Sequence, residues 1–205
     1  MRRLAAPAAT AEDLWRCLCL ARGATHLHSL RAGQLWRLGA SLVLHYDARH
    51  LLGNTAFAAV LARRRDQQSV LACCALLANL LSSLASPDAL VMGCSPLAFA
   101  LLALRLGEAA RSGRYPLWLG LAAGALLASF RSPLSDRVGH FSAFALGLLW
   151  RALEGADRRA VFYAAAAGLA LVGLLAVRLR VLSPEQEFAA RLNHGCLGPF
   201  SAPGA

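Results

Sequence analysis

The sequence predicts an all-α fold, a polytopic transmembrane helical bundle with about six membrane helices. The 205-residue chain is 58% hydrophobic and only 16% charged, whereas about 25% of the residues of a soluble domain are charged. The apolar residues gather in six runs, at about 42–62, 69–86, 89–104, 116–130, 138–153 and 160–182. The first and last runs reach the roughly 20 residues that a helix needs to cross the hydrocarbon. The shorter runs suggest helices that start below the membrane surface, inside a bundle.

Small residues recur in two of these runs. They include "LGLAAGALLA" at 119–128 and "AAAAGLALVGLL" at 164–175. Gly and Ala are typical of places where helices pack closely in lipid, because they let the backbones approach. We therefore expect close helix packing.

The charged residues predict the orientation. All 21 basic residues are arginine and the net charge is +10, which in a soluble protein would suggest nucleic acid. Here nine arginines fall in the loops after the first, third and fifth runs, and two in those after the second and fourth: Arg63, Arg64, Arg65, Arg105, Arg111, Arg114, Arg151, Arg158 and Arg159 against Arg131 and Arg137. The positive-inside rule then puts the first set in the cytoplasm, or in the matrix or stroma of an organelle. We expect an integral membrane protein of a bacterial inner membrane or an organelle membrane, with the lipid bilayer and not nucleic acid as its partner.

Four parts follow along the chain. Residues 1–34 are rich in Arg and hold no apolar run long enough to span, so they form an interfacial helix, a transit-like segment or a truncated region. Residues 35–155 form the membrane core and 156–183 an additional C-terminal transmembrane helix. Residues 184–205 are a polar tail.

Polar side chains cluster at the beginnings of three runs. The stretches are "HYDARHLLGN" at 45–54, "GCSPLAF" at 93–99 and "VGHFSAFALG" at 138–147. Polar groups inside a membrane are costly and mark function by default. By the charge argument all three runs begin on the outer side, so these groups share the outer half of the bilayer. If each run is helical throughout, His50 and Asn54 lie roughly 12–18 Å below the outer end of theirs.

The residue types fit nucleophilic chemistry. A serine needs a base, and His is the usual one, so His140 can activate Ser95. An oxyanion needs hydrogen-bond donors. His50 and Asn54, four residues apart on one helical face, can donate to it together with the N–H of Ser95.

The residues around Ser95 agree with this hypothesis. Ser followed by Pro96 predicts a helix that begins at Ser95, with free N–H groups and the positive end of the dipole at the hydroxyl. Gly93 allows a close approach of the backbone. Phe99, one turn after Ser95, can pack on His140 and fix the plane of its ring.

Two small residues follow His140. Ala143 and Gly147 are three and seven residues after it. They share its helical face and would let this helix press against the one that starts at Ser95. No metal site is expected, because no further ligands follow His26 and His28 at the usual spacing.

Together these stretches resemble the rhomboid family of intramembrane serine proteases over about residues 34–153. The resemblance lies in Trp36–Arg37 before the first run, in the H-x4-H-x3-N pattern of 45–54, in "GCSP" where the family has G-x-S-G, and in "GHFSAFALG". Order and spacing agree throughout. The fold that the resemblance implies is a rhomboid-like bundle.

The resemblance also implies an activity. It implies a Ser95–His140 catalytic dyad without a third acid, and an oxyanion site that uses His50 and Asn54. A water-accessible cavity lined by His45 would open to the outer face, and transmembrane protein substrates would be cleaved near their outer ends. The loop of Trp36 and Arg37 would lie partly embedded in the outer leaflet. The reaction would need no metal and no cofactor.

The chain departs from the family pattern in two ways. Pro96 stands where Gly usually follows the serine, which removes an N–H and adds a ring where close helix contact is expected. The first membrane helix of the six-helix core is missing, whereas the run at 160–182 adds one after the core.

Two other functions remain as alternatives. A catalytically inactive rhomboid-like protein would bind transmembrane clients; Pro96 favours it and the complete set of Ser, His and Asn opposes it. A small channel or transporter would need polar residues along a path through both halves of the membrane. The polar set lies in the outer half only, which opposes this alternative.

Overall fold

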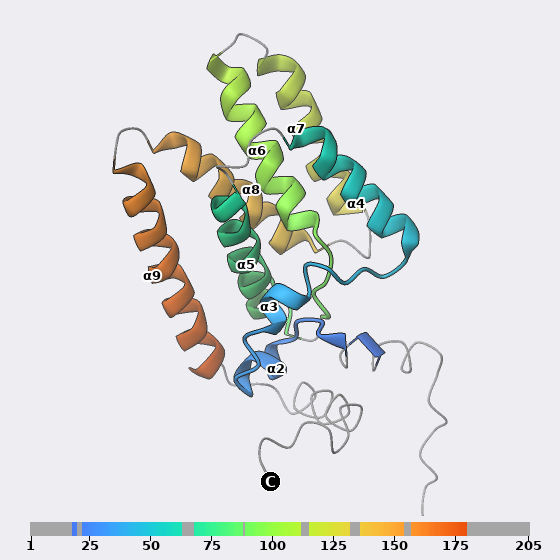
Figure 1. Cartoon of the computed structure of the whole chain (residues 1–205), viewed down its shortest axis with the longest axis vertical. Helices are drawn as coiled ribbons and strands as arrows, with labels where there is room; N and C mark the ends of the chain where they lie inside the picture. Colours follow the sequence, from blue (N-terminus) through green and yellow to red (C-terminus); the bar gives the residue numbers. More distant parts are fainter. Residues whose placement is uncertain are drawn as a thin grey trace, which may run out of the picture.

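The computed structural model describes residues 18–19, 22–62, 68–87, 89–111, 115–131, 136–153 and 157–179. Its helices are α2 (Leu27–Arg31), α3 (Arg37–Ala40), α4 (Ala48–Leu61), α5 (Gln68–Ala85), α6 (Ser95–Arg111), α7 (Tyr115–Arg131), α8 (Arg137–Ala152) and α9 (Arg158–Leu179). The β-structure of this part is one isolated bridge, between Thr25 and Val91. The all-α fold is therefore confirmed for the described residues (Figure 1). The tail at 184–205, and residues 1–17 of the segment 1–34, lie outside them.

Each predicted apolar run overlaps one helix. α6 begins at Ser95, as the Ser95–Pro96 pair predicted, although both α4 and α6 begin several residues after the start of their apolar runs. α4 begins at Ala48 and not near 42, because the Asp47 carboxylate accepts the His50 N–H at 2.7 Å and caps the helix there. The segment 89–94 precedes α6 and is not helical; Val91 and Thr25 exchange two backbone hydrogen bonds of 2.9 and 3.0 Å. An apolar extended segment and an apolar helix cannot be distinguished by composition.

The later helix starts change the depth of the polar residues. His50 lies in the first turn of α4 and Asn54 in the second, Ser95 is the first residue of α6, and His140 is the fourth residue of α8. At the helical rise of 1.5 Å per residue, all four lie within about 10 Å of the start of their helix. The expected depth of 12–18 Å for His50 and Asn54 was wrong because it counted residues 42–47 as helix. His45 lies before α4 and not on it.

Two described helices are long and apolar enough to cross a membrane, α5 and the part of α9 from Ala160 to Leu179. Pro116–Ser129 of α7 is a shorter apolar helix. Large apolar side chains are exposed on α7 and α9: Leu117, Leu119, Leu121, Leu127, Val161, Leu169, Leu171, Val172, Leu175 and Leu179. Exposed apolar surface of this extent is unfavourable in water and favourable in lipid. The total of six membrane helices stays a prediction.

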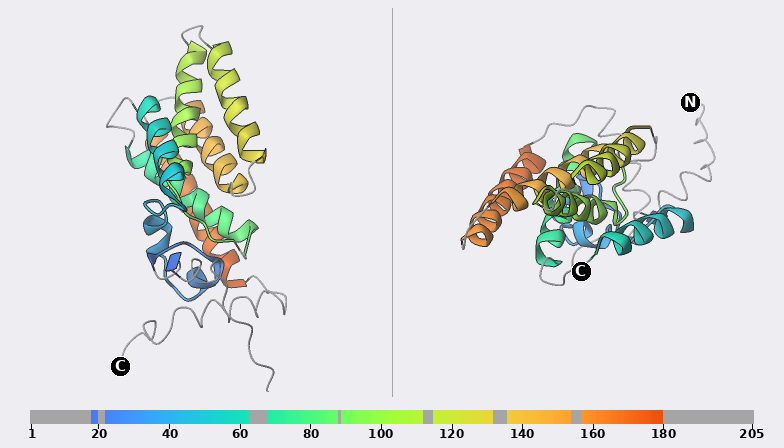
Figure 2. Two further views of the ribbon diagram at one scale, coloured as in Figure 1. Left: turned by 90° about the vertical axis from the view of Figure 1, so that its right-hand side faces the viewer. Right: turned by 90° about the horizontal axis from the view of Figure 1, so that it is seen from above.

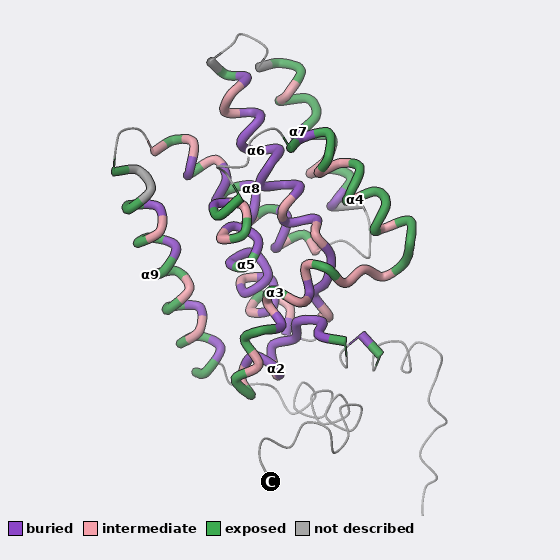
Figure 3. Tube along the Cα trace, viewed as in Figure 1, coloured by how far each residue is buried: buried purple, intermediate pink, exposed green. Residues whose placement is uncertain are grey.

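α6 is the central helix of the bundle. It contacts α4, α5, α7 and α8, and every residue from Ala98 to Leu106 is buried (Figure 3). A helix buried on all its faces must be enclosed by neighbours. α9 and α4 lie on opposite sides of this centre, as Figure 1 and the view from above in Figure 2 both show.

Arg105 lies inside α6 and not in a loop, which corrects its place in the charge count. Its side chain is buried, its Nε donates to the Leu61 carbonyl at 2.7 Å, and its Nη1 forms an ion pair with Glu108. A buried charge is tolerated when it is paired and hydrogen-bonded. This arginine therefore holds the end of α4 against α6.

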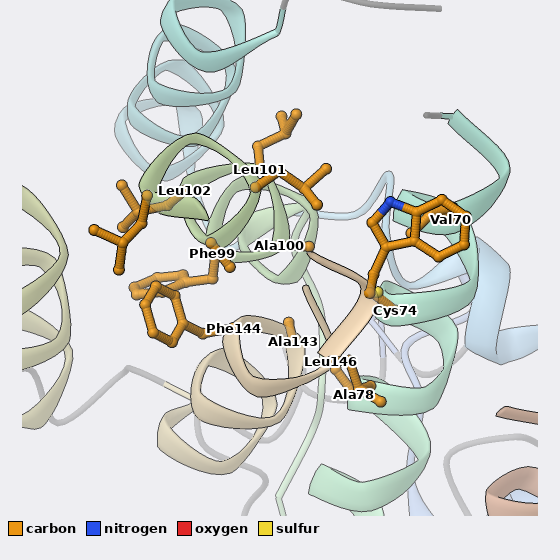
Figure 4. Close-up of a cluster of buried hydrophobic side chains, with 14 of the residues drawn as sticks. Val70, Cys74, Ala78, Phe99, Ala100, Leu101, Leu102, Ala143, Phe144 and Leu146 are labelled. Atoms are coloured by element: carbon orange, nitrogen blue, oxygen red, sulfur yellow. The ribbon is translucent and has the colours of Figure 1, made fainter. Parts of the chain in front are cut away.

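α8 packs against α6 through small residues. A Cβ atom on Gly147 would lie 2.8 Å from the Ala103 Cβ and 2.9 Å from the Ala100 carbonyl oxygen, and Ala143 is fully buried. Figure 4 shows Ala100 and Ala143 among the buried side chains between the two helices, with Cys74 of α5 beside them. The predicted contact of Ala143 and Gly147 with this helix is confirmed.

Replacing Gly147 with Val should destabilise the bundle. The added side chain cannot fit against α6 unless the helices separate, and overpacking of this kind costs about 1–3 kcal/mol. Thermal unfolding of the purified protein in detergent measures the effect. Gly124→Val is the matched control, because a Cβ on Gly124 meets nothing within 4 Å. Equal melting temperatures for the two variants would contradict the close packing.

Candidate active site

Ser95 and His140 meet at the beginnings of α6 and α8. The Ser95 Oγ lies 2.7 Å from the His140 Nε2, although the residues are 45 positions apart in the chain. Both side chains are buried, with 7% and 8% of their surface exposed. The hydroxyl is thus in hydrogen-bond reach of a nitrogen that can accept its proton.

The cap of α8 fixes the backbone of His140. The Asp136 carboxylate accepts the Gly139 N–H at 2.8 Å, and the Asp136 carbonyl accepts the His140 N–H at 3.0 Å. The Ser82 hydroxyl of α5 donates to the same carboxylate oxygen. The first turn of α8 is therefore attached to α5.

Two further side chains hold the His140 ring. Phe99 stacks on it with ring centroids 4.3 Å apart and planes 14° apart, the contact that the one-turn spacing from Ser95 predicted. The Ser129 Oγ of α7 lies 2.5 Å from the His140 Nδ1. The imidazole is thus in contact at both nitrogens and on one face.

The segment before Ser95 is held by the N-terminal part of the chain. Thr25 pairs with Val91, and the Gly93 N–H donates to the Ser41 carbonyl at 2.8 Å. Gly93 has φ +113°, a conformation that favours glycine. These bonds set the position from which α6 begins.

Arg37 holds the stretch of that N-terminal part around Ala24 and Thr25. Its guanidinium donates to the Ala24 carbonyl at 3.3 Å and to Gln34 at 2.6 Å, and its own carbonyl accepts from Thr25. Trp36 is 58% exposed and lies under the guanidinium of Arg37, 4.7 Å from ring centroid to Cζ. Trp36 and Arg37 thus help to hold the segment around Ala24 and Thr25, which in turn pairs with Val91.

His50 and Asn54 approach the backbone just before the serine. A Cβ on Gly93 would lie 3.0 Å from His50 Cε1 and 3.4 Å from Asn54 Nδ2. The Nδ1 of His50 and the Nδ2 of Asn54 are buried and have no hydrogen-bond partner. Leaving a buried donor unpaired costs about 1–3 kcal/mol, so these two nitrogens could bind an oxygen atom placed near Gly93.

His45 and Tyr46 complete the surroundings of His50. The His45 Nε2 accepts the Cys94 N–H at 3.3 Å, and the rings of His45 and His50 meet edge to face at 5.1 Å. The Tyr46 ring stacks on the His50 ring with their centroids 5.8 Å apart, and the Tyr46 hydroxyl donates to the Leu90 carbonyl at 2.9 Å. Both side chains therefore join α4 to the segment that carries the serine.

Sequence reasoning missed Ser129 and Tyr46. Ser129 is the one hydroxyl residue in the otherwise apolar run at 116–130, a signal that could have been used. Such a serine commonly bonds to its own helix, so the run alone did not indicate a contact with His140. That contact forms because the end of α7 lies near the start of α8. Among the described residues, no group of three or more His, Cys, Asp or Glu side chains could hold a metal ion.

The comparisons with known proteins identify one family. Residues 32–157, more than half of the chain, match the family model described as the Rhomboid domain. No curated protein and no solved structure matches the chain. The matched range contains α3 to α8 and therefore all the residues that meet around Ser95 and His140.

Gly93→Ala should slow the reaction of Ser95 with a fluorophosphonate probe at least tenfold, because an added methyl group would displace His50 and Asn54, and lost oxyanion donors cost factors of this size or more. Gly33→Ala is the control for backbone strain. Gly33 also has a positive φ, +84°, but a Cβ there meets nothing within 4 Å. If Gly33→Ala slowed labelling as much as Gly93→Ala does, backbone strain alone would explain the slower labelling.

Proposed function

The chain belongs to the rhomboid family and is therefore a membrane protein, and from this premise we propose that it is an intramembrane serine endopeptidase that cleaves transmembrane protein substrates. One observation carries the proposal. Two buried side chains from different helices, Ser95 and His140, form a hydrogen bond of 2.7 Å between the nucleophilic oxygen and the ring nitrogen that would accept its proton. Members of this family usually use such a pair.

The proposed reaction has two halves. The Ser95 Oγ attacks the carbonyl carbon of the scissile peptide bond while its proton passes to the His140 Nε2. His140 then gives this proton to the leaving amine, and the C–N bond breaks to leave an acyl ester on Ser95. A water molecule attacks the ester with His140 again as the base, and the carboxylic acid product and the serine hydroxyl are regenerated.

The oxyanion of each half needs donors. His50 Nδ1 and Asn54 Nδ2 are buried and unpaired beside Gly93, and the Ser95 N–H lies in the first turn of α6, where a helix leaves its N–H groups without internal partners. Donors held ready in a low-dielectric site stabilise the developing charge strongly. In this proposal His45 lines the substrate cavity beside Cys94.

Pro96 is compatible with this chemistry. It is the second residue of α6, and the Cys94 carbonyl before it accepts from Leu97 and Ala98 at 3.0 and 3.3 Å. An N–H at that position would have no partner within the helix, so a proline there breaks no helical bond. The alternative, an inactive rhomboid-like protein that binds transmembrane clients, therefore receives no support from the helix geometry.

The wider assignment is part of the same proposal. Residues 35–155 would form the rhomboid-like core and 156–183 an additional helix, in a bacterial inner membrane or an organelle membrane. The exposed Trp36 suits the outer leaflet, because indole rings prefer the membrane interface. The expected partners are transmembrane substrates and the surrounding lipid.

Ser95→Ala and His140→Ala should each abolish cleavage of a single-span substrate by the purified protein in detergent. The first removes the nucleophile and the second the base. Ser142→Ala, which removes another hydroxyl from α8, is the control for folding and should cleave at the normal rate. Cleavage by the double variant would exclude the dyad. A well-folded wild-type protein that cleaves none of several substrates would favour the client-binding alternative.

Asn54→Ala should lower kcat by roughly 10- to 1,000-fold, the range seen when one oxyanion donor is removed. KM should change little, because the charge that Asn54 would meet exists only in the transition state. The exposed neighbour Thr55 on the same helix gives the control variant Thr55→Ala. If kcat is the same for both variants, Asn54 has no role as an oxyanion donor.

A further inference from the structure

The contact between Ser129 and His140 adds a third group to the pair. Ser129 lies near the end of α7 and only 7% of its surface is exposed. Its Oγ lies 2.5 Å from the His140 Nδ1. Ser95 stands on the other ring nitrogen, at 2.7 Å. The imidazole therefore lies between two serine hydroxyls from two different helices.

The position of the proton on the imidazole ring determines which group donates in each of these two hydrogen bonds. A neutral imidazole carries one proton, so one nitrogen donates and the other accepts. If His140 is to accept the Ser95 proton at Nε2, the ring proton must be on Nδ1. Nδ1–H then donates to the Ser129 oxygen, whereas a ring proton on Nε2 would reverse both bonds and leave no acceptor for the Ser95 proton.

We propose that Ser129 is a positioning residue for His140: its oxygen accepts the Nδ1–H, which keeps Nε2 free for the Ser95 proton. The inference rests on the proposed function for its catalytic meaning, whereas the tautomer can be measured without it. After proton transfer the ring is an imidazolium with a proton on each nitrogen. The Nδ1–H bond to Ser129 persists through this step, and the oxygen then faces a positive charge.

A hydroxyl suits this position better than a carboxylate would. An ionised acid buried at membrane depth carries a large desolvation penalty, whereas a serine is neutral at rest. The nearby carboxylate of Asp136 accepts from Ser82 and from the Gly139 N–H instead. A neutral acceptor orients the ring less strongly than an acid, and Phe99 supplies further restraint through its stacking on the same ring.

Ser129→Ala should reduce kcat by roughly ten- to a hundredfold with little change in KM, a loss of the size seen when the hydrogen-bond partner of a metal-bound histidine is removed. Ser129→Thr keeps the hydroxyl and should restore most of the rate. Ser142→Ala is again the control for the loss of a hydroxyl near His140. A normal kcat for Ser129→Ala, or a loss that Thr does not restore, would overturn the proposal.

Nitrogen-15 NMR of His140, in the uninhibited wild-type protein and in Ser129→Ala, provides the second measurement. The signals are assigned by their absence in His140→Ala. We expect the proton on Nδ1, and a mixture of both tautomers in Ser129→Ala. A proton on Nε2 in the wild type would overturn the proposal, whether or not the protein cleaves a substrate. Failure of all substrates to be cleaved, with the Nδ1–H tautomer present, would count against the proposed function alone.

Discussion

The contact of Gly147 with the backbone of α6 is the constraint on which the candidate site depends. Gly147 lies seven residues after His140, and its contacts Ala100 and Ala103 lie five and eight residues after Ser95. The contact is thus about two turns from both Ser95 and His140. Because the two helices meet both at Ser95 and His140 and again about two turns later at Gly147, α6 and α8 run in the same direction with their first turns level. The 2.7 Å bond between Ser95 and His140 depends on that register.

The direction of these two helices also explains what surrounds the pair. The chain between them forms α7, which must return to the end of the bundle from which α8 begins, and Ser129 in its last turns therefore reaches His140. α4 contributes its first two turns at the same end, where His50 and Asn54 approach Gly93. Polar groups from four helices are thus gathered at one end of an apolar bundle.

The sequence predicted the six longer helices, α4 to α9, their order and several of the contacts around Ser95. Local spacing predicted the stacking of Phe99 on His140 and the small-residue face of α8, since both depend on helical periodicity. The extent of the apolar runs was a poor guide at residues 42–44 and 89–94, which are apolar but not helical, because the Asp47 cap begins α4 at Ala48 and the Thr25–Val91 bridge holds the second segment. Ser129 required the tertiary arrangement, because nothing local in α7 indicates which neighbour its hydroxyl meets.

The groups described around the His140 ring, two serine hydroxyls and the Phe99 ring, are uncharged, and this suits the electrostatics of the proposed reaction. At rest, Ser95, His140 and Ser129 are neutral in the proposed reaction, so none of them carries the desolvation cost of a buried charge. When the proton moves, the imidazolium and the oxyanion appear together as a pair of opposite charges, whose attraction is strong in a low-dielectric environment. If His50 and Asn54 act as the proposed oxyanion donors, the energy of leaving their buried nitrogens unpaired is recovered only when the oxyanion forms. The arrangement therefore favours the transition state over the resting state.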